Sequence, residues 1–442
     1  MTYPETIRFL YGLRLHGLKL GLENTQRLAG WVGRPQDRLR FIHVAGTNGK
    51  GSTCAMLESI YRRAGLRVGL FTSPHLVSFR ERVQVDRRWI TEAEVVAAVE
   101  QLRPLLDRFP SDHPPTFFEV VTVLALCHFA ERHCDLVIWE TGMGGRLDAT
   151  NIVQPLASLI TNIQLDHQHW LGSTRAAIAA EKAGIIKPGV PALTTTDDPE
   201  ALAVIRQAAA RVDAPLSVVP DAESTACGLP SDWPVPLQGR HQRTNAALAL
   251  ATVRALQTHL PVADRIAQEG LASVQWPGRM QLVRQTTGPD VLLDAAHNLS
   301  GMEALLRTLT AEYPQCRPAF ILGMLRDKDW EAMGALAASQ ATRIFLVPVQ
   351  SERSASPDEL AAACQRVRPD AVVIPRPSLA AALAAAHDEP LVVVAGSLYL
   401  VGEATELLGL APENTRAEHE LNEWLPAKTD QAAPSPAAAS CR

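Results

Sequence analysis

The chain has 442 residues, of which 47% are hydrophobic and 20% charged, a globular composition long enough for two or three domains. The formal net charge of −5 implies no basic face, which argues against a nucleic-acid partner, and no apolar run reaches the length of a membrane span. Seven scattered cysteines without a CxxC pair argue against a disulfide framework or a zinc site, and the N-terminus lacks a signal peptide's apolar core, so we expect a cytoplasmic protein.

The first strong pattern is residues 41–54, FIHVAGTNGKGSTC. It predicts a buried strand, a glycine-bearing loop and then a helix to about residue 64. Such a loop gathers backbone N–H groups and a positive helix end at one place, which suits a phosphate. Lys50 adds a positive charge for the β- and γ-phosphates, and Ser52 or Thr53 offers a hydroxyl for Mg²⁺ or a phosphate oxygen.

The strict phosphate-loop pattern GxxxxGK[ST] is nevertheless not met. Val44 stands where the first glycine belongs, and Gly51 separates Lys50 from Ser52. An ordinary tight turn between a strand and a helix is therefore the competing interpretation. Polar groups at the ends of neighbouring strands are needed to choose between the two.

Strands and helices alternate along the next 200 residues. Strands are predicted at residues 66–72, 136–139, 156–161 and 215–219, and helices at 91–107, from 116, at 173–183 and from 239. This alternation predicts βαβ units and a parallel sheet, whose ligand crevice lies at the carboxyl ends of the strands. Ser73, Glu140 and His167 each follow a predicted strand and so belong to the same edge as the phosphate loop.

A second α/β series follows residues 276–280, WPGRM, which we interpret as a hinge. Its predicted strands are at residues 291–294, 319–324, 343–349, 371–375 and 390–396, with helices between them. The fold class is therefore α/β. We expect a larger domain over residues 1–280, a smaller doubly wound domain over 281–425 and a disordered low-complexity tail over 426–442.

The polar residues at the sheet edge suit a divalent cation. Hydroxyl, carboxylate and imidazole ligands from Ser73, Glu140 and His167 fit Mg²⁺ shared with substrate phosphates. Taken alone, His167 is better interpreted as a hydrogen-bonded loop histidine, and it is the phosphate loop and Glu140 beside it that favour a metal ligand. Lys182, in EKAGIIKPG, reads on physical grounds as an ordinary solvated helical lysine.

The second series carries its own candidates. Asp294 ends a strand at a crevice, with His297 and Asn298 opening the next helix, although Asp294 or Asn298 could instead be a structural N-cap. Arg279 follows Pro-Gly at the hinge, where its guanidinium could either reach phosphates or lie on the surface.

A series of motifs in this order resembles the folylpolyglutamate synthase/dihydrofolate synthase family of the Mur ligase superfamily. The motifs are HVAGTNGKGSTC, TSPHL, ETGMGGRLDATN, LDHQHWLG with EKAGIIKPG, WPGR, LLDAAHN and AGSLYL, and the resemblance runs from about residue 10 to residue 405. The extra glycine in GKGS resembles the folate branch, since Mur ligases more typically show GKT. The resemblance implies an ATP-dependent ligase that adds L-glutamate to dihydropteroate, giving dihydrofolate, and to reduced folates, through an acyl phosphate.

The same resemblance implies a Mur-ligase-like P-loop ATPase domain with a parallel sheet and a role for individual residues. ATP would be bound by Asn48, Gly49, Lys50, Gly51, Ser52, Asn245, Arg279 and Asp294. Two Mg²⁺ ions would be held by Ser73, Glu140, His167 and Lys182, the last of which resembles a lysine that is carbamylated in the family. Catalytic roles would fall to Lys50, Lys182 and His297.

Pterin contacts would come from Thr116, Phe117, Phe118, Glu119, Arg146, Leu147 and Asp148. Residues 17–20 resemble another contact segment, although Lys19 stands where some bifunctional relatives carry an acid. The expected partners are small molecules only, with no nucleic acid and no membrane, and the expected state is a monomer.

Alternatives to the bifunctional ligase remain open. They are a folylpolyglutamate synthase alone, a Mur-type ligase acting on a UDP-sugar peptide, and a non-catalytic nucleotide-binding protein. The GKGS form and the lack of a recognisable UDP-binding domain before residue 40 argue against the Mur-type ligase. The presence together of Lys50, Glu140, His167 and Lys182 argues against the non-catalytic protein.

Overall fold

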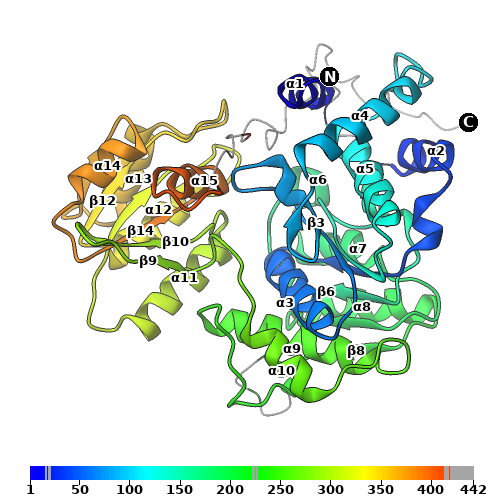
Figure 1. Ribbon diagram of the computed structural model, residues 1–442. Coiled ribbons are helices and arrows are strands. Elements are labelled where there is room, and N and C mark those ends of the chain that lie inside the picture. Colours follow the sequence, from blue (N-terminus) through cyan, green and yellow to red (C-terminus); the bar gives the residue numbers. More distant parts are fainter. Residues whose placement is uncertain (15–16, 18–20, 222–223, 225–226, 413–417, 419–442) are drawn as a thin grey trace, which may run out of the picture.

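Two β-sheets organise the protein. The computed structural model describes residues 1–14, 17, 21–221, 224, 227–412 and 418. Its sheets have eight strands in the order β4-β3-β2-β5-β1-β6-β7-β8 and six in the order β13-β12-β11-β14-β10-β9, and Figure 1 shows them as separate bodies beside each other. The predicted disordered tail lies outside the described residues. Within the described part, no helix is both long and apolar enough to cross a bilayer.

The first sheet is parallel over six of its strands. Its members are β1 (Phe41–Ala45), β2 (Val68–Phe71), β3 (Val83–Val85), β4 (Arg88–Trp89), β5 (Leu136–Glu140), β6 (Ala157–Ile160), β7 (Ala192–Thr194) and β8 (Leu216–Val218). Strands β2, β5, β1, β6, β7 and β8 pair in parallel, and β3 and β4 add an antiparallel hairpin at one edge. The predicted parallel α/β sheet is confirmed.

Helices cover both faces of this sheet, which is why its strands are apolar throughout. Ile42 and Val44 of β1 pack on one face with α3 (Lys50–Arg63), α9 (Arg240–Ala255) and α10 (Asp264–Ala272). Phe41 of the same strand packs on the other face. The helices there are α1 (Tyr3–Leu13), α2 (Glu23–Trp31), α4 (Glu92–Leu106) and α5 (Phe117–Glu131).

Shorter elements complete this part of the chain. They are η2 (Pro35–Arg38), η3 (Phe79–Arg82), η4 (Ala149–Ile152), α6 (Gln168–Leu171), α7 (Arg175–Ala183) and α8 (Pro199–Arg211). Helices α7 and α8 pack together over the sheet end that contains β6 and β7.

The second sheet is a smaller doubly wound unit. Its strands are β9 (Gln281–Val283), β10 (Asp290–Leu293), β11 (Ala319–Leu322), β12 (Arg343–Leu346), β13 (Val372–Pro375) and β14 (Leu391–Ala395). Helices α11 (Leu299–Glu312), α12 (Trp330–Gln340) and α13 (Pro357–Val367) cover one face, and α14 (Leu379–Ala385) and α15 (Leu398–Leu407) cover the other. The five predicted strands are present, and β9 is an antiparallel edge strand that the sequence did not predict, because its three residues are too few to show a periodic pattern.

The strand register decides where the polar groups lie. In the parallel ladders Val44 is opposite Glu140, Ala45 is opposite Ile160 and Phe71 is opposite Trp139. The carboxyl ends of β2, β5, β1 and β6 therefore form one continuous edge, and the loops that follow them leave the sheet side by side.

Candidate active site between the two sheets

The glycine-rich loop after β1 is shaped by close contacts rather than by flexibility. Gly46 has φ +149°, and a Cβ there would lie 1.7 Å from Thr161 Oγ1. The loop is held to the segment after β6, because Thr47 N donates to Asn162 O at 2.9 Å and Asn48 N donates to Asn162 Oδ1 at 2.8 Å. A side chain at residue 46 would push the loop off this support.

Two further glycines fit specific neighbours. Gly49 has φ +86°, and a Cβ there would lie 2.5 Å from Asn245 Oδ1 on α9. A Cβ on Gly51, in the first turn of α3, would lie 3.1 Å from Trp276 Nε1. The glycine that departs from the general phosphate-loop pattern therefore lets the start of α3 approach the segment that leads into the second sheet.

Two lysines converge on this loop. Lys50 Nζ donates to the carbonyl oxygens of Gly46 at 3.1 Å and Thr47 at 3.2 Å, and Lys182 Nζ donates to Gly46 O at 2.8 Å. Lys182 is only 4% exposed, so the alternative of a solvated helical lysine does not hold. Burial, followed by the charge of Lys50, lowers the pKa of Lys182 to about 7. A substantial fraction of this amine is therefore uncharged near neutral pH.

Glu140 ends β5 inside the same site. Its Oε2 accepts a hydrogen bond from Ser73 N at 3.1 Å, and its side chain is buried. Burial raises the pKa of Glu140 to about 7, an effect that the charge of Lys50 opposes. A cation held near this carboxylate would stabilise its ionised form.

One pocket of about 490 Å³ brings most of the predicted residues together. It is lined by the phosphate loop over residues 46–52 and by Ser73, Glu140, His167, Lys182, Asn245, Arg279, Asp294 and His297. His167 is the N-cap residue that precedes α6, with φ +51°; it lines the pocket, and its side chain is 40% exposed. Among the described residues, no three His, Cys, Asp or Glu side chains are arranged as a complete metal site. The hydroxyl of Ser73, the carboxylate of Glu140 and the imidazole of His167 are nevertheless donor types that could bind a divalent cation whose other ligands are phosphate oxygens and water.

The second sheet supplies the other wall of the pocket. Asp294 accepts hydrogen bonds from Met280 N and Ala296 N, both at 2.9 Å, so its carboxylate orders the turn around Arg279. Asp294 is not an N-cap, because Asn298 caps α11 by accepting from Gly301 N at 2.9 Å. Burial lowers the pKa of Arg279, whose guanidinium lines the pocket together with His241.

A polar cluster across the two sheets was not predicted from the sequence. Lys328 Nζ, from the loop after β11, lies 2.5 Å from Asp166 Oδ1, from the loop after β6. Asn298 Nδ2 donates to Asp166 Oδ2 at 3.0 Å and to Asn48 Oδ1 at 3.0 Å. Although burial alone would raise the pKa of Asp166, the charges of His167 and Lys328 hold it well below its ordinary value. The signal for Lys328 in the sequence was the charged run RDKD at residues 326–329, separated by three residues from the end of the buried strand β11.

The segments predicted to contact a pterin do not line this pocket. Thr116 and Glu119 form a capping box at the start of α5, with Thr116 N donating to Glu119 Oε2 at 2.6 Å and Glu119 N donating to Thr116 Oγ1 at 3.3 Å. Phe117 is buried beside Phe79, and Phe118 lies against Gly142, a residue of the pocket.

The second predicted segment is built into its own loop. Asp148 accepts hydrogen bonds from Met143 N at 2.8 Å and Thr150 N at 3.0 Å, and Arg146 forms an ion pair with Glu181 at 2.8 Å. Leu147 O accepts from Gly21 N at 3.4 Å. Of the predicted contact segment 17–20, residues 18–20 lie outside the described residues.

The comparisons with known proteins match the two halves of this site. Residues 44–253 match the Mur ligase middle domain, and residues 278–398 match the glutamate ligase domain of Mur ligases. The dihydrofolate synthase/folylpolyglutamate synthase of Bacillus subtilis is 39% identical over 352 residues, which cover 75% of this chain and 81% of that protein. The Escherichia coli protein of the same name is 35% identical over 414 residues, covering 91% of this chain and 94% of that protein.

Solved structures agree along nearly the whole chain. E. coli FolC in complex with DHPP and ADP has a TM-score of 0.82 at 33% identity, covering 93% of this chain and 98% of that one. The folylpolyglutamate synthase of Mycobacterium tuberculosis complexed with ADP and AMPPCP has a TM-score of 0.84 at 30% identity, covering 93% of this chain and all of that one.

Proposed function

The chain belongs to the dihydrofolate synthase/folylpolyglutamate synthase family, which is built on Mur ligase domains, and we propose on that basis that it is an ATP-dependent ligase. Its substrates are L-glutamate with dihydropteroate, giving dihydrofolate, and L-glutamate with reduced folates, giving folylpolyglutamates. The observation that carries the proposal is the single pocket in which the phosphate loop and Lys50 face Arg279, Asp294 and His297 of the second sheet.

ATP binds along the loop of residues 48–52. The free N–H groups at the start of α3 and the charge of Lys50 attract the phosphates. Asn245, Arg279 and Asp294 complete the nucleotide site from the other wall of the pocket. Ser73, Glu140 and His167 are the residues that would hold Mg²⁺, which would supply positive charge against the charge that develops on the transferred phosphoryl group.

Lys182 is the proposed ligand of a second Mg²⁺ after carbamylation. The uncharged amine attacks the carbon of CO₂: a N–C bond forms, one C=O π bond opens, and the nitrogen loses a proton, so that the neutral amine becomes a carbamate anion. The depressed pKa of Lys182 and its contact with the phosphate loop support this step. Incubation with ¹³CO₂ tests it directly, because a carbamate resonance absent from Lys182→Ala is expected in the ¹³C NMR spectrum, and identical spectra would contradict it.

The chemistry has two steps. A carboxylate oxygen of the pterin substrate attacks the γ-phosphorus of ATP, ADP leaves and an acyl phosphate forms. The uncharged amine of L-glutamate then attacks the carbonyl carbon, phosphate leaves with the bridging oxygen, and the amine loses a proton. Because water would destroy the acyl phosphate, contact between the two sheets is needed to exclude it.

His297 is the residue that we propose orients the amine. Its Nδ1 lies 2.9 Å from Ala295 O, which fixes the proton on Nδ1 and leaves Nε2 as a hydrogen-bond acceptor. Burial lowers the pKa of His297 to about 4, so the ring stays neutral at neutral pH. A neutral acceptor can hold an N–H of the attacking amine without repelling it.

The remaining parts of the proposal concern the pterin and the assembly. Residues 116–119 and 146–148 are proposed to contact the pterin, supported by the position of Phe118 against Gly142. We also propose a division into domains over residues 1–280 and 281–425, a monomer, and action in the cytoplasm. Light scattering that shows a dimer would contradict the monomer.

A substrate panel with purified protein tests the activity. ADP release is expected only when L-glutamate is present with dihydropteroate or with tetrahydrofolate. Activity with tetrahydrofolate but not with dihydropteroate would identify a folylpolyglutamate synthase that lacks dihydrofolate synthase activity. The proposal would be overturned if no ADP were released with either pterin, or if turnover occurred only with a UDP-linked sugar peptide.

A further inference from the structure

The loop between β2 and η3, residues 72–78, lies where the nucleotide pocket meets the second sheet. Near its start Ser73 lines the pocket and donates its N–H to Glu140 Oε2 at 3.1 Å. Further along, Leu76 packs against the hydrophobic core of the second sheet, and a Cβ on Gly278 would lie 3.1 Å from Leu76 Cδ1. A displacement of this loop would therefore change both the pocket and the contact between the two sheets.

The β2–η3 loop contains no helix or strand, and one carboxylate gives it its shape. Glu81 accepts hydrogen bonds from the backbone N–H groups of residues 76–78 at distances of 2.7–2.8 Å. Because these bonds lie within the segment, they fix its shape but not its position relative to the pocket. The position has to come from contacts with other parts of the chain.

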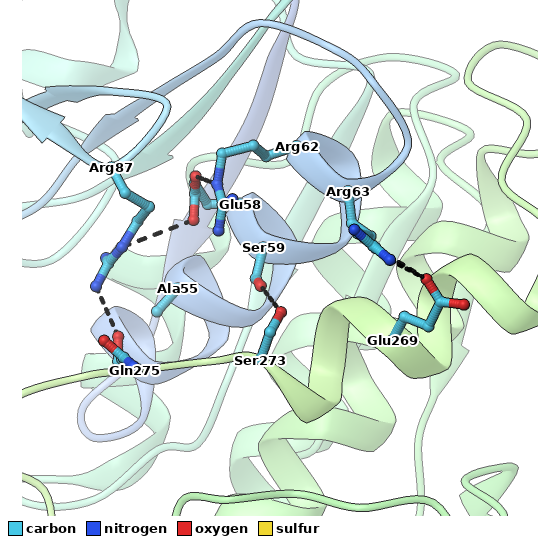
Figure 2. A pocket seen from close by; sticks show the side chains of 9 residues that line it. All are labelled: Ala55, Glu58, Ser59, Arg62, Arg63, Arg87, Glu269, Ser273 and Gln275. Atoms are coloured by element: carbon cyan, nitrogen blue, oxygen red, sulfur yellow. Dashed lines mark hydrogen bonds and ion pairs between the residues drawn. The ribbon is translucent and has the colours of Figure 1, made fainter.

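One such contact lies beyond η3, at the turn between β3 and β4. Figure 2 shows Arg87 of this turn beside α3, where its Nη2 donates to Gln275 O at 2.7 Å and its Nε lies 3.9 Å from Glu58 Oε2. The hairpin that follows the loop is therefore fixed at its far end. The loop lies at the other end of the hairpin, so it needs an anchor of its own.

Glu418 supplies that anchor. Its Oε2 accepts hydrogen bonds from Phe79 N at 2.6 Å, from Ser78 Oγ at 3.2 Å and from Tyr3 Oη at 3.1 Å. The first two donors belong to η3 and the loop, the third lies on α1, and Glu418 itself follows α15, so one carboxylate oxygen connects three distant segments. Glu418 is only 7% exposed, and hydrogen bonds to a carboxylate in such a place are stronger than those between neutral groups.

The backbone of Glu418 binds the same loop. Its N–H donates to Val77 O at 2.9 Å, and its carbonyl oxygen lies 2.9 Å from His75 Nε2. Arg82 Nε donates to His75 Nδ1 at 2.9 Å, so the proton of this ring is on Nε2 and the ring donates to Glu418 O. The Arg82 guanidinium in turn lies 5.4 Å from the centre of the Phe117 ring, in the segment proposed to contact the pterin. The contacts of Glu418 therefore extend toward the pterin segment as well as toward the pocket.

These contacts distinguish Glu418 from an ordinary core residue. Both its side chain and its backbone bind the loop that carries Ser73, and Glu418 does not itself line the pocket. It touches no substrate bound there, so any effect it has on the reaction passes through the loop. Burial raises the pKa of Glu418, which means that its surroundings do not favour a negative charge over a neutral oxygen at the same place.

We propose that Glu418 is a positioning residue of the ligase, which holds the β2–η3 loop so that Ser73 keeps its place beside Glu140. Its contact with the loop is independent of any reaction, whereas its effect on turnover rests on the ligase function proposed above. Loss of the Glu418 side chain releases residues 78 and 79 and, through them, displaces Ser73 N from the Glu140 carboxylate.

The test follows two backbone N–H groups by NMR in the full chain without substrates. Thr72–Ser73 is the only Thr-Ser step in the sequence, and Ser78–Phe79 is the only Ser-Phe step. Labelling with ¹³C-carbonyl threonine and ¹⁵N-serine therefore selects the Ser73 amide, and ¹³C-carbonyl serine with ¹⁵N-phenylalanine selects the Phe79 amide. In Glu418→Ala both amide proton signals are expected to move upfield, because each N–H loses part or all of its hydrogen bond to a carboxylate.

Three further variants separate positioning from a general loss of charge or stability. Glu418→Gln keeps the length of the side chain and an oxygen for the same donors, so both signals are expected to stay close to those of the unaltered chain. Glu418→Asp keeps the charge but withdraws the carboxylate by one CH₂ group, so both signals are expected to move upfield, by less than in Glu418→Ala. Glu331→Ala, which breaks an exposed pair with Arg366, is the control and is expected to move neither signal.

ADP release with dihydropteroate and L-glutamate measures the consequence for the reaction. The kcat of Glu418→Ala is expected to fall by about tenfold, the equivalent of one hydrogen bond to a charged group, and that of Glu418→Asp is expected to fall by less. Glu418→Gln and Glu331→Ala are expected to stay within about twofold of the unaltered chain.

Three results would each overturn the proposal. They are an unmoved Phe79 signal in Glu418→Ala, an unmoved Ser73 signal in that variant, and a kcat for Glu418→Ala equal to that of Glu331→Ala. Greater losses in Glu418→Gln than in Glu418→Asp would also contradict it, because the charge rather than the reach of the side chain would then matter. If the unaltered chain released no ADP, the ligase function would be contradicted instead, and the two NMR signals would still decide whether Glu418 positions Ser73.

Discussion

The ion pair between Lys328 and Asp166 joins the loops of the two sheets and predicts a large effect from one substitution. The side chains are 10% and 8% exposed and lie 2.5 Å apart. Lys328→Met leaves the Asp166 carboxylate buried with two hydrogen-bond donors that carry no full charge, the side-chain amide of Asn298 at 3.0 Å and the backbone N–H of His167 at 2.8 Å. Losing one member of a buried pair costs about 3 kcal/mol, because the remaining charge is uncompensated.

This cost falls on the contact between the sheets. Asp166 regains water when the loops separate, so the arrangement in which they touch becomes less populated by about a hundredfold, at about 1.4 kcal/mol for each factor of ten. We expect kcat/KM for ATP to fall by a similar factor, and the radius of gyration of the ADP complex in small-angle X-ray scattering to increase.

Two variants separate this effect from a general loss of charge. Asp166→Asn combined with Lys328→Met removes both charges and is expected to recover activity by at least about tenfold over Lys328→Met alone, since no buried charge remains. Arg326→Met, in the same loop, breaks an exposed pair with Glu359 and is expected to cost less than about 1 kcal/mol. If Lys328→Met matches Arg326→Met in both activity and scattering, the reasoning is refuted.

Three further predictions concern the phosphate loop and the core. Lys182→Ala is expected to lower turnover by about a hundredfold, whereas Lys187→Ala, on the segment that follows, stays within about twofold, as measured by ADP release; equal rates would remove the proposed role of Lys182. Gly46→Ala is expected to lower the free energy of unfolding in urea by about 3 kcal/mol, because the added Cβ would lie 1.7 Å from Thr161 Oγ1. Gly30→Ala is the control and is not expected to destabilise the fold, because its added Cβ meets nothing within 4 Å. His43 is fully buried, and burial lowers its pKa from 6.5 to about 3. The stability that the neutral ring contributes is therefore complete above pH 6.5 and is lost as the pH falls toward 3. By pH 5 the free energy of unfolding of the unaltered chain should fall by about 2 kcal/mol more than that of His43→Gln, and equal falls in the two proteins would contradict this.

The arrangement at the sheet edge was predictable because it depends on local patterns. Apolar runs followed by polar residues located β1, β2, β5 and β6, and the parallel pairing of these strands then placed Ser73, Glu140 and His167 beside the phosphate loop. The burial of Lys182 was not predictable from the pattern of α7, because it results from the loop after β1 lying over that helix.

Contacts between distant segments account for most of what was missed. Asp166 and Lys328 are 162 residues apart, and the sequence around each residue does not indicate which residue it pairs with. Gly51 was recognised as a departure from the general motif, but its physical reason, the approach of Trp276, appears only once the chain has folded. The sequence TFFE at residues 116–119 carried a capping-box pattern that was readable in advance and that the structure contains.

The central claim, that a carboxylate is activated as an acyl phosphate before glutamate attacks it, has a direct isotopic test. The enzyme is given ATP, L-glutamate and dihydropteroate with ¹⁸O in both carboxylate oxygens, and the released phosphate is analysed by mass spectrometry. One ¹⁸O is expected in each phosphate, and the other is expected in the new amide. Phosphate that is released without ¹⁸O while the amide forms would contradict the mechanism.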